Sequence, residues 1–380
     1  MSDAADVVDH YATVGVNYGN LDPFKLMCQQ AGLETTQFLA ERGLGEVPES
    51  RGESCALIDM GDHYAGQVIE GLGTKNLVAQ AMQDLTGSAH WWEGIGQDSL
   101  AMILNDLICL GARPVSVLMY AAVGHDDWLK PDTEIKQERM EALVRGWKNG
   151  CITCRCAWVG GETPGLPKVV CPEAIDMAGA AFGIVRPKTD LLIGHKIRIG
   201  DTIIMVGSSG IHSNGISGAR DVADNMLPNG YMTPCGDSTF GAQILRPTIL
   251  YSPLVENWLD LTGRVDIRYT MNITGHGLKK VMRAEQPFSY VITSIPEPQP
   301  VFRLIQGAKG LSDEEMYRTY NMGNGFAAIV SKDTVTAAVA TANEMGFEAW
   351  IAGEVREAID GQKSVYIEPL GITYDDLAVR

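Results

Sequence analysis

Apolar and polar residues take turns along this 380-residue chain in patterns that predict helices and strands. Between Leu100 and Leu110 the apolar positions follow helical spacing, and Gly111 stands where a helix commonly ends. Pro114 then opens an apolar run, 115–123, that is rich in β-forming residues. We therefore expect a helix followed directly by a strand.

Predicted helices and strands continue to alternate to the end of the chain, and this alternation is typical of an α/β layer structure. We expect a turn at Gly160-Gly161, and the segment 186–200 mixes Pro, Gly and charge as linkers do. This places an N-terminal domain at 1–188 and a C-terminal domain at 189–380. Further helices are predicted at 133–149 (closed by Gly150), after Asn214, and at 252–261, 301–307 and 333–345, and further strands at 156–159, 175–185, 201–207, 288–293, 326–330 and 347–353.

Composition and charge exclude several classes of protein. Hydrophobic residues make up 45% and charged residues 20%, which does not fit intrinsic disorder. The net charge of −17 argues against nucleic-acid and anionic-membrane partners, because both need a basic surface. The N-terminus has no signal-peptide pattern, and polar residues interrupt the most apolar stretch, 100–123. We expect a cytoplasmic protein with no membrane span.

The eight cysteines include a C-x2-C-x-C cluster at Cys151, Cys154 and Cys156. No second cysteine pair follows at zinc-finger spacing, since Cys171 stands alone. A cytoplasmic protein keeps such thiols reduced. We predict free thiols packed between a helix and a strand.

Glycine is enriched, with 42 residues, and the first glycine motif of interest is Gly71-Leu72-Gly73-Thr74-Lys75. Two glycines expose backbone N–H groups, while Thr74 and Lys75 supply a hydroxyl and a cation, as in phosphate-binding loops. The spacing is not that of a Walker A loop. The alternative is a glycine turn with a solvated lysine.

Carboxylate and amide groups recur on the predicted helix at Asp98, Asn105 and Asp106. Asp98 and Asn105 are about two helical turns apart and share one face, with Asp106 at its margin. Such oxygen ligands suit Mg²⁺. The alternative is structural, with Asp98 as an N-cap and Asp106 as a buried acid that has a partner.

Three further segments combine glycine with polar side chains at the ends of predicted strands. Ligands gather there in open α/β sheets, although turns explain each segment alone. Ser208–Gly215 holds Ser and His without a G-x-S-x-G elbow, so an anion site suits it better than a hydrolase. In the first segment, Glu162 and Thr163 follow Gly160-Gly161. The second segment supplies Ser209, Gly210, His212, Ser213 and Asn214. The third supplies Thr274 and Gly275 before His276-Gly277, and a later segment at 315–323 is a further candidate.

The order and wording of these segments, GLGTK, GQD…ND, GGET, SSGIHSNG, RPTILY, ITGHG, EMYRTYNMG and GEV, resemble the aminoimidazole ribonucleotide synthetase (phosphoribosylformylglycinamidine cyclo-ligase) family. The resemblance runs from about Tyr11 to Val355. It implies an α/β (α+β) fold of two domains, with the N-terminal domains pairing through their sheets in a homodimer. It also implies ATP-dependent ring closure of formylglycinamidine ribonucleotide in purine biosynthesis, with ATP and Mg²⁺ in a cleft.

The resemblance also implies roles for individual residues. Glu70, Asp98 and Asp106 would hold Mg²⁺, and His212, Lys75 and Asp98 would be catalytic. ATP and its phosphates would meet Gly71, Gly73, Thr74, Lys75, Asn105, Gly160, Gly161, Glu162 and Thr163. The ribonucleotide would meet Ser209, Gly210, His212, Ser213, Asn214, Thr274 and Gly275.

The chain departs from the family pattern at four places. Glu70 replaces an Asp before the GLGTK glycines, and Tyr11–Asn17 reads YATVGVN in place of YKDAGVD. His276 replaces a glycine, and the glycine-rich segment near 40–55 is reduced to Gly43-Leu44-Gly45. The alternatives are another ATP-dependent phosphoryl-transfer enzyme of the wider superfamily, or a non-catalytic nucleotide-binding homologue.

Overall fold

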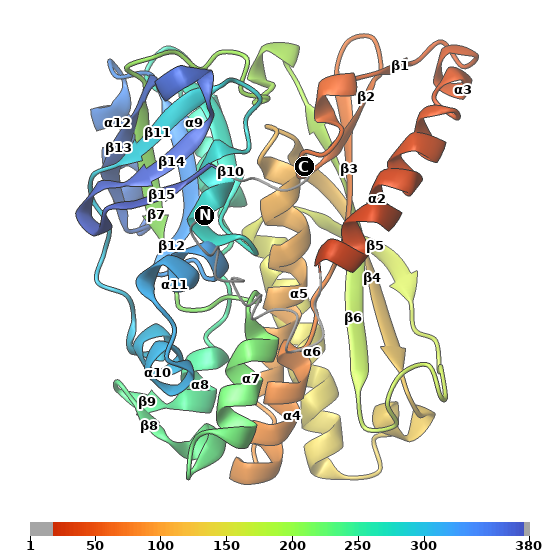
Figure 1. Cartoon of the computed structure of the whole chain (residues 1–380). Coiled ribbons are helices and arrows are strands. Elements are labelled where there is room, and N and C mark those ends of the chain that lie inside the picture. Colours follow the sequence, from red (N-terminus) through yellow and green to blue (C-terminus); the bar gives the residue numbers. More distant parts are fainter. Residues whose placement is uncertain (1–17, 376–380) are drawn as a thin grey trace.

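The computed structural model describes residues 18–375, so the Tyr11–Asn17 departure lies outside the described part of the chain. Figure 1 shows two β-sheets on opposite sides of a central group of helices. One sheet uses strands from residues 45–185 and the other strands from residues 202–374. Helix α5 (Trp91–Ile108) stands between them.

The first sheet has six strands in the order β1-β2-β3-β6-β4-β5. Neighbours pair antiparallel except β4 and β5, which are parallel. Strand β6 alternates buried and less buried residues, because helices cover one face of the sheet only. The strands are β1 (Gly45–Glu46), β2 (Ala56–Asp59), β3 (Tyr64–Gly71), β4 (Arg113–Val123), β5 (Ala157–Glu162) and β6 (Ile175–Val185).

Helices α5 and α6 pack against each other over the covered face of this sheet. Gly96 and Gly146 permit that close approach, since a Cβ at Gly146 would lie 1.9 Å from the Glu93 carbonyl oxygen. The helices of this half are α2 (Tyr18–Leu33), α3 (Gln37–Ala40), α4 (Lys75–Thr86), α5 and α6 (Glu134–Thr153), with short 3-10 helices η1 (Pro48–Ser50), η2 (Asp126–Leu129) and η3 (Lys188–Asp190).

The second sheet has seven strands in the order β10-β12-β7-β13-β11-β14-β15. Its central strands β7 and β12 are buried along their whole length, which their continuous apolar sequences require. The strands are β7 (Thr202–Gly207), β10 (Ile267–Asn272), β11 (Phe288–Ile292), β12 (Asn324–Val330), β13 (Ala349–Glu357), β14 (Ser364–Ile367) and β15 (Ile372–Tyr374), and a separate ribbon pairs β8 (Pro234–Cys235) with β9 (Ser238–Thr239).

Helices of the second half surround this sheet and the ribbon. Helix α10 begins at Pro300, a position at which proline is favoured because its missing N–H is not needed there. The helices are α7 (Ile216–Asn225), α8 (Phe240–Ile244), α9 (Ser252–Asp260), α10 (Pro300–Lys309), α11 (Asp313–Thr319) and α12 (Val335–Glu344), with η4 (Gly230–Met232), η5 (Gly277–Met282), η6 (Ile359–Gly361) and η7 (Glu368–Leu370).

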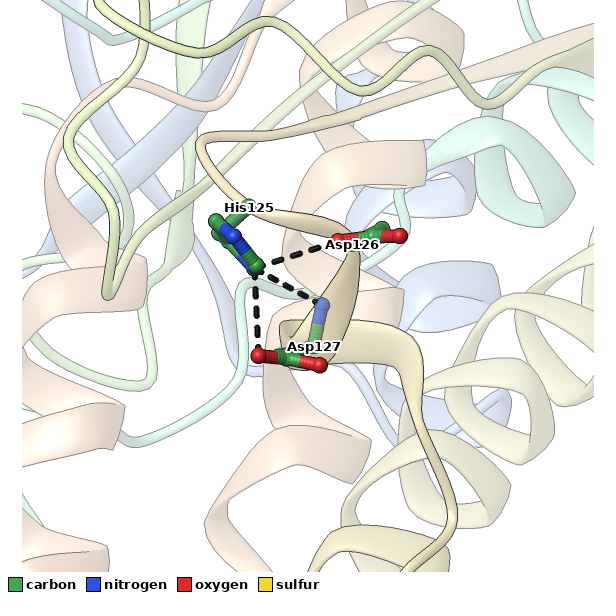
Figure 2. Close-up of side chains that lie close together, drawn as sticks. All are labelled: His125, Asp126 and Asp127. Carbon is green, nitrogen blue, oxygen red and sulfur yellow. Dashed lines mark hydrogen bonds and ion pairs between the residues drawn. The ribbon is translucent and has the colours of Figure 1, made fainter.

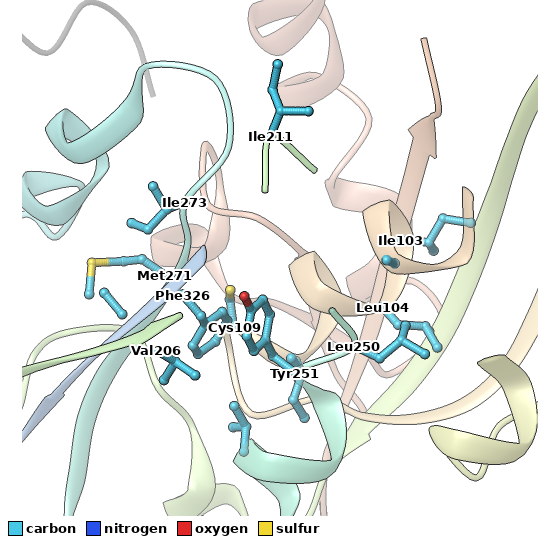
Figure 3. Close-up of a cluster of buried hydrophobic side chains, with 14 of the residues drawn as sticks. Ile103, Leu104, Cys109, Val206, Ile211, Leu250, Tyr251, Met271, Ile273 and Phe326 are labelled. Carbon is cyan, nitrogen blue, oxygen red and sulfur yellow. The ribbon is translucent and has the colours of Figure 1, made fainter. Parts of the chain in front are cut away.

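A continuous apolar core joins the two halves. Figure 3 shows Leu104 of α5, and Cys109 directly after the helix, beside Leu250, Tyr251 and Phe326 of the second half. Among these, Tyr251 stacks on Phe326 with ring centroids 5.0 Å apart. Helix α5 therefore belongs to the core of both halves.

Most predicted helices and strands are confirmed with shifts of a few residues at their ends, but α5 begins at Trp91, well before the predicted Leu100, and two other details were wrong. Helix α6 runs through Gly150 to Thr153 instead of ending at Gly150. Gly160 and Gly161 lie inside β5 and form no turn. A Cβ at Gly161 would lie 2.0 Å from the Met119 carbonyl oxygen on β4, so that glycine serves close strand pairing.

The eight cysteines are free, as expected. Cys151, Cys154 and Cys156 are buried where α6 meets β5, and burial raises the pKa of each thiol. No helix within residues 18–375 combines the length and the apolar character that a membrane span needs.

Candidate functional site

One end of the α5 interface is a fully buried ion pair between Lys75 and Asp98. Their Nζ and Oδ2 atoms are 2.8 Å apart, and both side chains are 0% exposed. Lys75 also donates to the Arg246 carbonyl oxygen at 2.9 Å. Asp98 Oδ1 accepts from the backbone N–H (2.7 Å) and the hydroxyl (2.5 Å) of Thr248. The pair thus fastens the first half of the chain to the 246–248 segment of the second.

Two more polar residues of α5, Gln97 and Asn105, also bind the segment that follows Arg246. Gln97 donates to the Thr248 carbonyl oxygen at 2.9 Å. Asn105 donates to the Ile249 carbonyl oxygen at 2.8 Å and accepts from the Tyr251 N–H at 2.9 Å. The predicted ligand positions Asp98 and Asn105 therefore share one face, as the spacing indicated, and both engage the RPTILY segment.

The SSGIHSNG loop follows β7 and leads into α7, next to this interface. Ser213 Oγ lies 3.2 Å from Thr248 Oγ1, and Ser209 donates its hydroxyl to the Pro247 carbonyl oxygen at 2.6 Å. His212 is buried, and its Nε2 accepts from the Ser209 N–H at 3.3 Å. Burial, with a smaller contribution from Lys75, lowers the pKa of His212 to about 3, so the ring is neutral at pH 7.

The distant MYRTYNMG segment holds the other side of this loop. Asn321 accepts from the Ser208 hydroxyl at 3.0 Å and donates to the Gly210 carbonyl oxygen at 2.9 Å. Gly215 has φ +74°, and a Cβ there would lie 2.3 Å from the Tyr320 ring, so the position requires glycine. The two segments most characteristic of the resemblance are thus in direct contact.

The GLGTK segment lies at the junction of β3 and α4. Gly71 ends β3, Gly73 has φ +75°, and Thr74 precedes the first residue of α4. Thr74 Oγ1 lies 3.4 Å from Ser217 Oγ on α7, which places the segment beside the SSGIHSNG loop. In this conformation the lysine of the segment is turned inward, and only Thr74 and the glycines face solvent.

The other end of α5 carries a second group of charges, here named the Glu70–Asp106 cluster: Glu70, Asp106, Asn272, Thr274, Lys280 and Arg283. Asn272 at the end of β10 donates to Asp106 Oδ1 at 2.7 Å. Burial raises the pKa of Glu70 to about 7, and the Asp106 carboxylate adds to the rise. Two carboxylates thus stand close together without full neutralisation.

Two cations, Lys280 of η5 and Arg283 directly after η5, belong to this cluster. Lys280 donates to the Thr274 hydroxyl, and both Lys280 and Arg283 lower the pKa of Glu70. Arg283 also donates to the Ser54 hydroxyl at 2.9 Å and lies 3.4 Å from the Glu53 carboxylate. The first half of the chain supplies the acids, and the second half supplies most of the cations.

The three predicted metal ligands, Glu70, Asp98 and Asp106, do not lie together, because Asp98 is at the other end of α5. Asp98 and Asp106 are eight residues apart on one helix, which corresponds to about 12 Å along its axis. Both oxygens of Asp98 already have protein partners, whereas the buried Asp106 raises the pKa of the half-buried Glu70 by repulsion. The carboxylates of Glu70 and Asp106 are the type of ligand that a divalent cation takes, and the carboxylate of Asp98 is engaged within the protein.

The GGET segment lies apart from these loops within the protomer. Pairing registers place Gly71, Ala178, Tyr120 and Glu162 in one row across the sheet. Glu162 is therefore three strand spacings, about 14 Å, from Gly71. Gly160, Gly161, Glu162 and Thr163 line an exposed hollow of about 380 Å³ along the edge strand β5.

The remaining predicted residues, Thr274 and Gly275, form the turn that connects β10 to η5. The Gly277 N–H donates to the Thr274 carbonyl oxygen at 3.1 Å. His276 has φ +72°, a left-handed conformation that glycine adopts at less cost. The replacement of a family glycine by His276 is therefore accommodated with the same backbone shape.

One cluster outside these regions has the residue types of a metal site. Figure 2 shows His125, Asp126 and Asp127, which are consecutive and exposed. His125 accepts from the Asp127 N–H at 3.2 Å and so caps η2. This local hydrogen bond accounts for the arrangement.

Sequence reasoning missed several residues that the structure brings into the site. Thr248, Asn272 and Asn321 each make side-chain hydrogen bonds to a predicted residue or loop, and Lys280 and Arg283 balance the predicted acids. RPTILY and ITGHG were noted as segments, but only tertiary packing shows which of their neighbours contact the acids.

Both halves of the chain match models of known protein families. Residues 52–185 match the model of the AIR synthase related protein, N-terminal domain, and residues 198–363 match that of the C-terminal domain. The chain belongs to the AIR synthase-related family. The family boundaries agree with the division into two sheets.

Curated relatives of this AIR synthase-related protein carry one name, phosphoribosylformylglycinamidine cyclo-ligase. The relative from Methanococcus vannielii is 33% identical over 313 residues, covering 82% of this chain and 83% of its own. The relative from Carboxydothermus hydrogenoformans is 37% identical over 291 residues, covering 75% and 79%.

Known structures resemble this AIR synthase-related chain in fold. T. maritima PurL complexed with FGAR has a TM-score of 0.55 at 14% identity, covering 88% of this chain and 48% of that one. AaThiL complexed with AMPPCP and TMP has a TM-score of 0.52 at 15% identity, covering 85% and 91%. The predicted α/β fold of two domains is confirmed.

Proposed function

We propose that this chain closes the imidazole ring of aminoimidazole ribonucleotide from formylglycinamidine ribonucleotide, using ATP. The relatives that share this name cover about four fifths of the chain. The observation that carries the proposal is the contact of Asn321 with Ser208 and Gly210. It joins the two segments whose wording separates the cyclo-ligase resemblance from other members of the superfamily.

In this reaction ATP phosphorylates the formyl oxygen, an amidine nitrogen attacks the activated carbon, and phosphate leaves as the ring closes. The protein must chiefly position the two substrates and offset their negative charge. Glu70 and Asp106 would hold Mg²⁺, which supplies positive charge to the phosphates of ATP. Thr74, Gly71 and Gly73 lie beside this position and offer a hydroxyl and backbone N–H groups.

We assign Lys75 and Asp98 to positioning. Their buried ion pair fixes the start of α4 against the 246–248 segment, and with it the GLGTK backbone. His212 is neutral and accepts a hydrogen bond from Ser209, so it shapes the ribonucleotide loop and does not act as a charged acid. The N-terminus of α7 directly follows Asn214 and Gly215, and its free N–H groups would bind an anionic group of the ribonucleotide.

The decisive experiment supplies purified protein with ATP, Mg²⁺ and formylglycinamidine ribonucleotide, and follows ADP and the aminoimidazole product. We expect stoichiometric ADP and product. ATP binding without product would indicate another phosphoryl-transfer reaction, and absence of ATP binding would indicate a non-catalytic homologue. Asn321→Leu should lower turnover strongly, whereas the exposed Lys332→Met should leave it unchanged.

The open face of the first sheet is apolar and exposed. This face presents Ile69 (76% exposed), Val159 (62%) and Leu118 (47%), which with Ala180 and Phe182 line an apolar hollow of about 530 Å³. Apolar sheet faces of this kind pack on one another in a two-sheet arrangement. We infer a homodimer in which the N-terminal sheets face each other.

Sedimentation of two charge variants tests the dimer. Ile69→Glu places a carboxylate in the middle of the apolar face and should shift the protein to a monomer. Ile359→Glu changes an equally exposed isoleucine (77%) in η6 of the other half and should leave the dimer intact. A dimer that survives the first variant would contradict this interface.

A further inference from the structure

The Glu70–Asp106 cluster contains a lysine whose place is fixed by the chain itself. Lys280 Nζ donates to the hydroxyl of Thr274, and Thr274 is two residues beyond Asn272. Asn272 in turn donates to Asp106 Oδ1 at 2.7 Å. The ammonium group is therefore held beside the end of β10, where Asp106 is bound.

The charges around Lys280 support the same placement. Burial lowers the pKa of Lys280, and the neighbouring Asp106 and Glu70 carboxylates oppose that change. Arg283 lies in the same cluster, but its charge is shared with Glu53, 3.4 Å away. Lys280 and Arg283 thus both act on the candidate metal ligands, and Arg283 is in addition paired with Glu53.

A count of charges shows what this lysine does. Glu70, Asp106 and Glu53 contribute three negative charges when ionised, and Lys280 and Arg283 contribute two positive charges, which leaves one negative charge. One divalent ion would change that balance to a net positive charge of one. Without Lys280 the same ion would only neutralise the cluster.

We propose that Lys280 makes divalent-metal binding at Glu70 and Asp106 depend on a polyphosphate ligand. Its positive charge repels a metal ion that arrives alone and attracts a metal ion that arrives with a polyanion. The inference rests on the proposed use of ATP, but it concerns metal binding and can be measured without ring closure.

The test measures binding of Mn²⁺ by electron paramagnetic resonance, with and without inorganic tripolyphosphate, in the full chain. We expect weak Mn²⁺ binding to the wild type alone and much tighter binding with tripolyphosphate. In Lys280→Met, Mn²⁺ alone should bind about tenfold or more tightly because a nearby like charge is gone. The enhancement by tripolyphosphate should shrink correspondingly.

Two variants control for charge and for folding. Lys280→Arg keeps the charge and should retain the wild-type dependence on tripolyphosphate, and Lys332→Met removes an exposed lysine and should change nothing. Unchanged or weaker Mn²⁺ binding in folded Lys280→Met, or loss of the dependence in Lys280→Arg, overturns the proposal. Product formation with unchanged Mn²⁺ binding would reject this inference alone, whereas the expected Mn²⁺ shift without product would reject only the ring-closing function.

Discussion

Asp98 and Asp106 are the same type of residue on the same helix, yet their surroundings are opposite. Asp98 faces Lys75 and two hydrogen-bond donors of Thr248, and water does not reach it. Asp106 faces Glu70 and has one donor, Asn272, at the 2.7 Å contact. The negative charge of Asp98 is compensated by Lys75, whereas the negative charges of Asp106 and Glu70 favour a bound cation.

This difference shows how one helix can fasten two halves together and still contribute to a binding site. A buried acid with a matched cation fixes geometry, because removing either partner leaves an unpaired charge. Two acids near each other favour binding of a cation. The chemistry of each position depends on its neighbours across the interface, and both positions look alike in sequence.

The strongest test of the comparison is Asp98→Asn, which should lower the free energy of unfolding by about 3–5 kcal/mol because Lys75 is left as an uncompensated buried cation. Urea denaturation without divalent ions measures the change. Asp106→Asn is the matched control and should cost less than about 1 kcal/mol, because it removes a like-charge repulsion. Equal losses in the two variants would refute the distinction.

The next effect concerns the hydroxyl that Thr248 donates to Asp98. Thr248→Val removes this charge-assisted hydrogen bond at nearly constant volume and should cost about 1.5–3 kcal/mol. Thr248→Ser keeps the hydroxyl and should cost clearly less. Urea denaturation again provides the measurement, and a Ser variant as unstable as the Val variant would show that methyl packing dominates.

For metal affinity we expect the opposite ranking, with the larger loss in Asp106→Asn and the smaller loss in Asp98→Asn. Asp106→Asn should weaken Mg²⁺ binding, measured by calorimetry in the presence of a non-hydrolysable ATP analogue, by at least about tenfold because a charged ligand is lost. Asp98→Asn, examined at a temperature where it remains folded, should keep the wild-type affinity. Weakened binding in both variants would return Asp98 to the ligand set.

The last prediction is a pH dependence of stability from His212, which lies near Lys75 at the Lys75–Asp98 end of α5. Its pKa is about 3 in the fold and about 6.5 when unfolded, so the unfolded state takes up the proton first as the pH falls. Stability from this group is present above pH 6.5 and declines toward pH 3, by up to about 1.4 kcal/mol per pH unit. His212→Gln should have a correspondingly shallower acid dependence in denaturation experiments. An identical slope would show that folding does not lower the pKa of His212.

Helices and strands with long regular patterns could be predicted from the sequence, as β6 at Ile175–Val185 shows. The region before β3 could not, because α2 and the short strands β1 and β2 have weak patterns. In the site, the spacing of Asp98 and Asn105 indicated one shared face, and the structure agrees. The role of Asp98 could not be predicted, because Thr248 is 150 residues away and Lys75 meets Asp98 only after folding.

The position of α5 in both apolar cores also has a consequence for unfolding. Because Leu104 of α5 and Cys109 at its C-terminal end pack with side chains of the second half, neither half can open without exposing this helix to water. The backbone amides of α5 should therefore exchange with deuterium only when the whole molecule unfolds, in a single cooperative transition. A chain cut by a protease within 186–200 should remain one particle, held together across that helix.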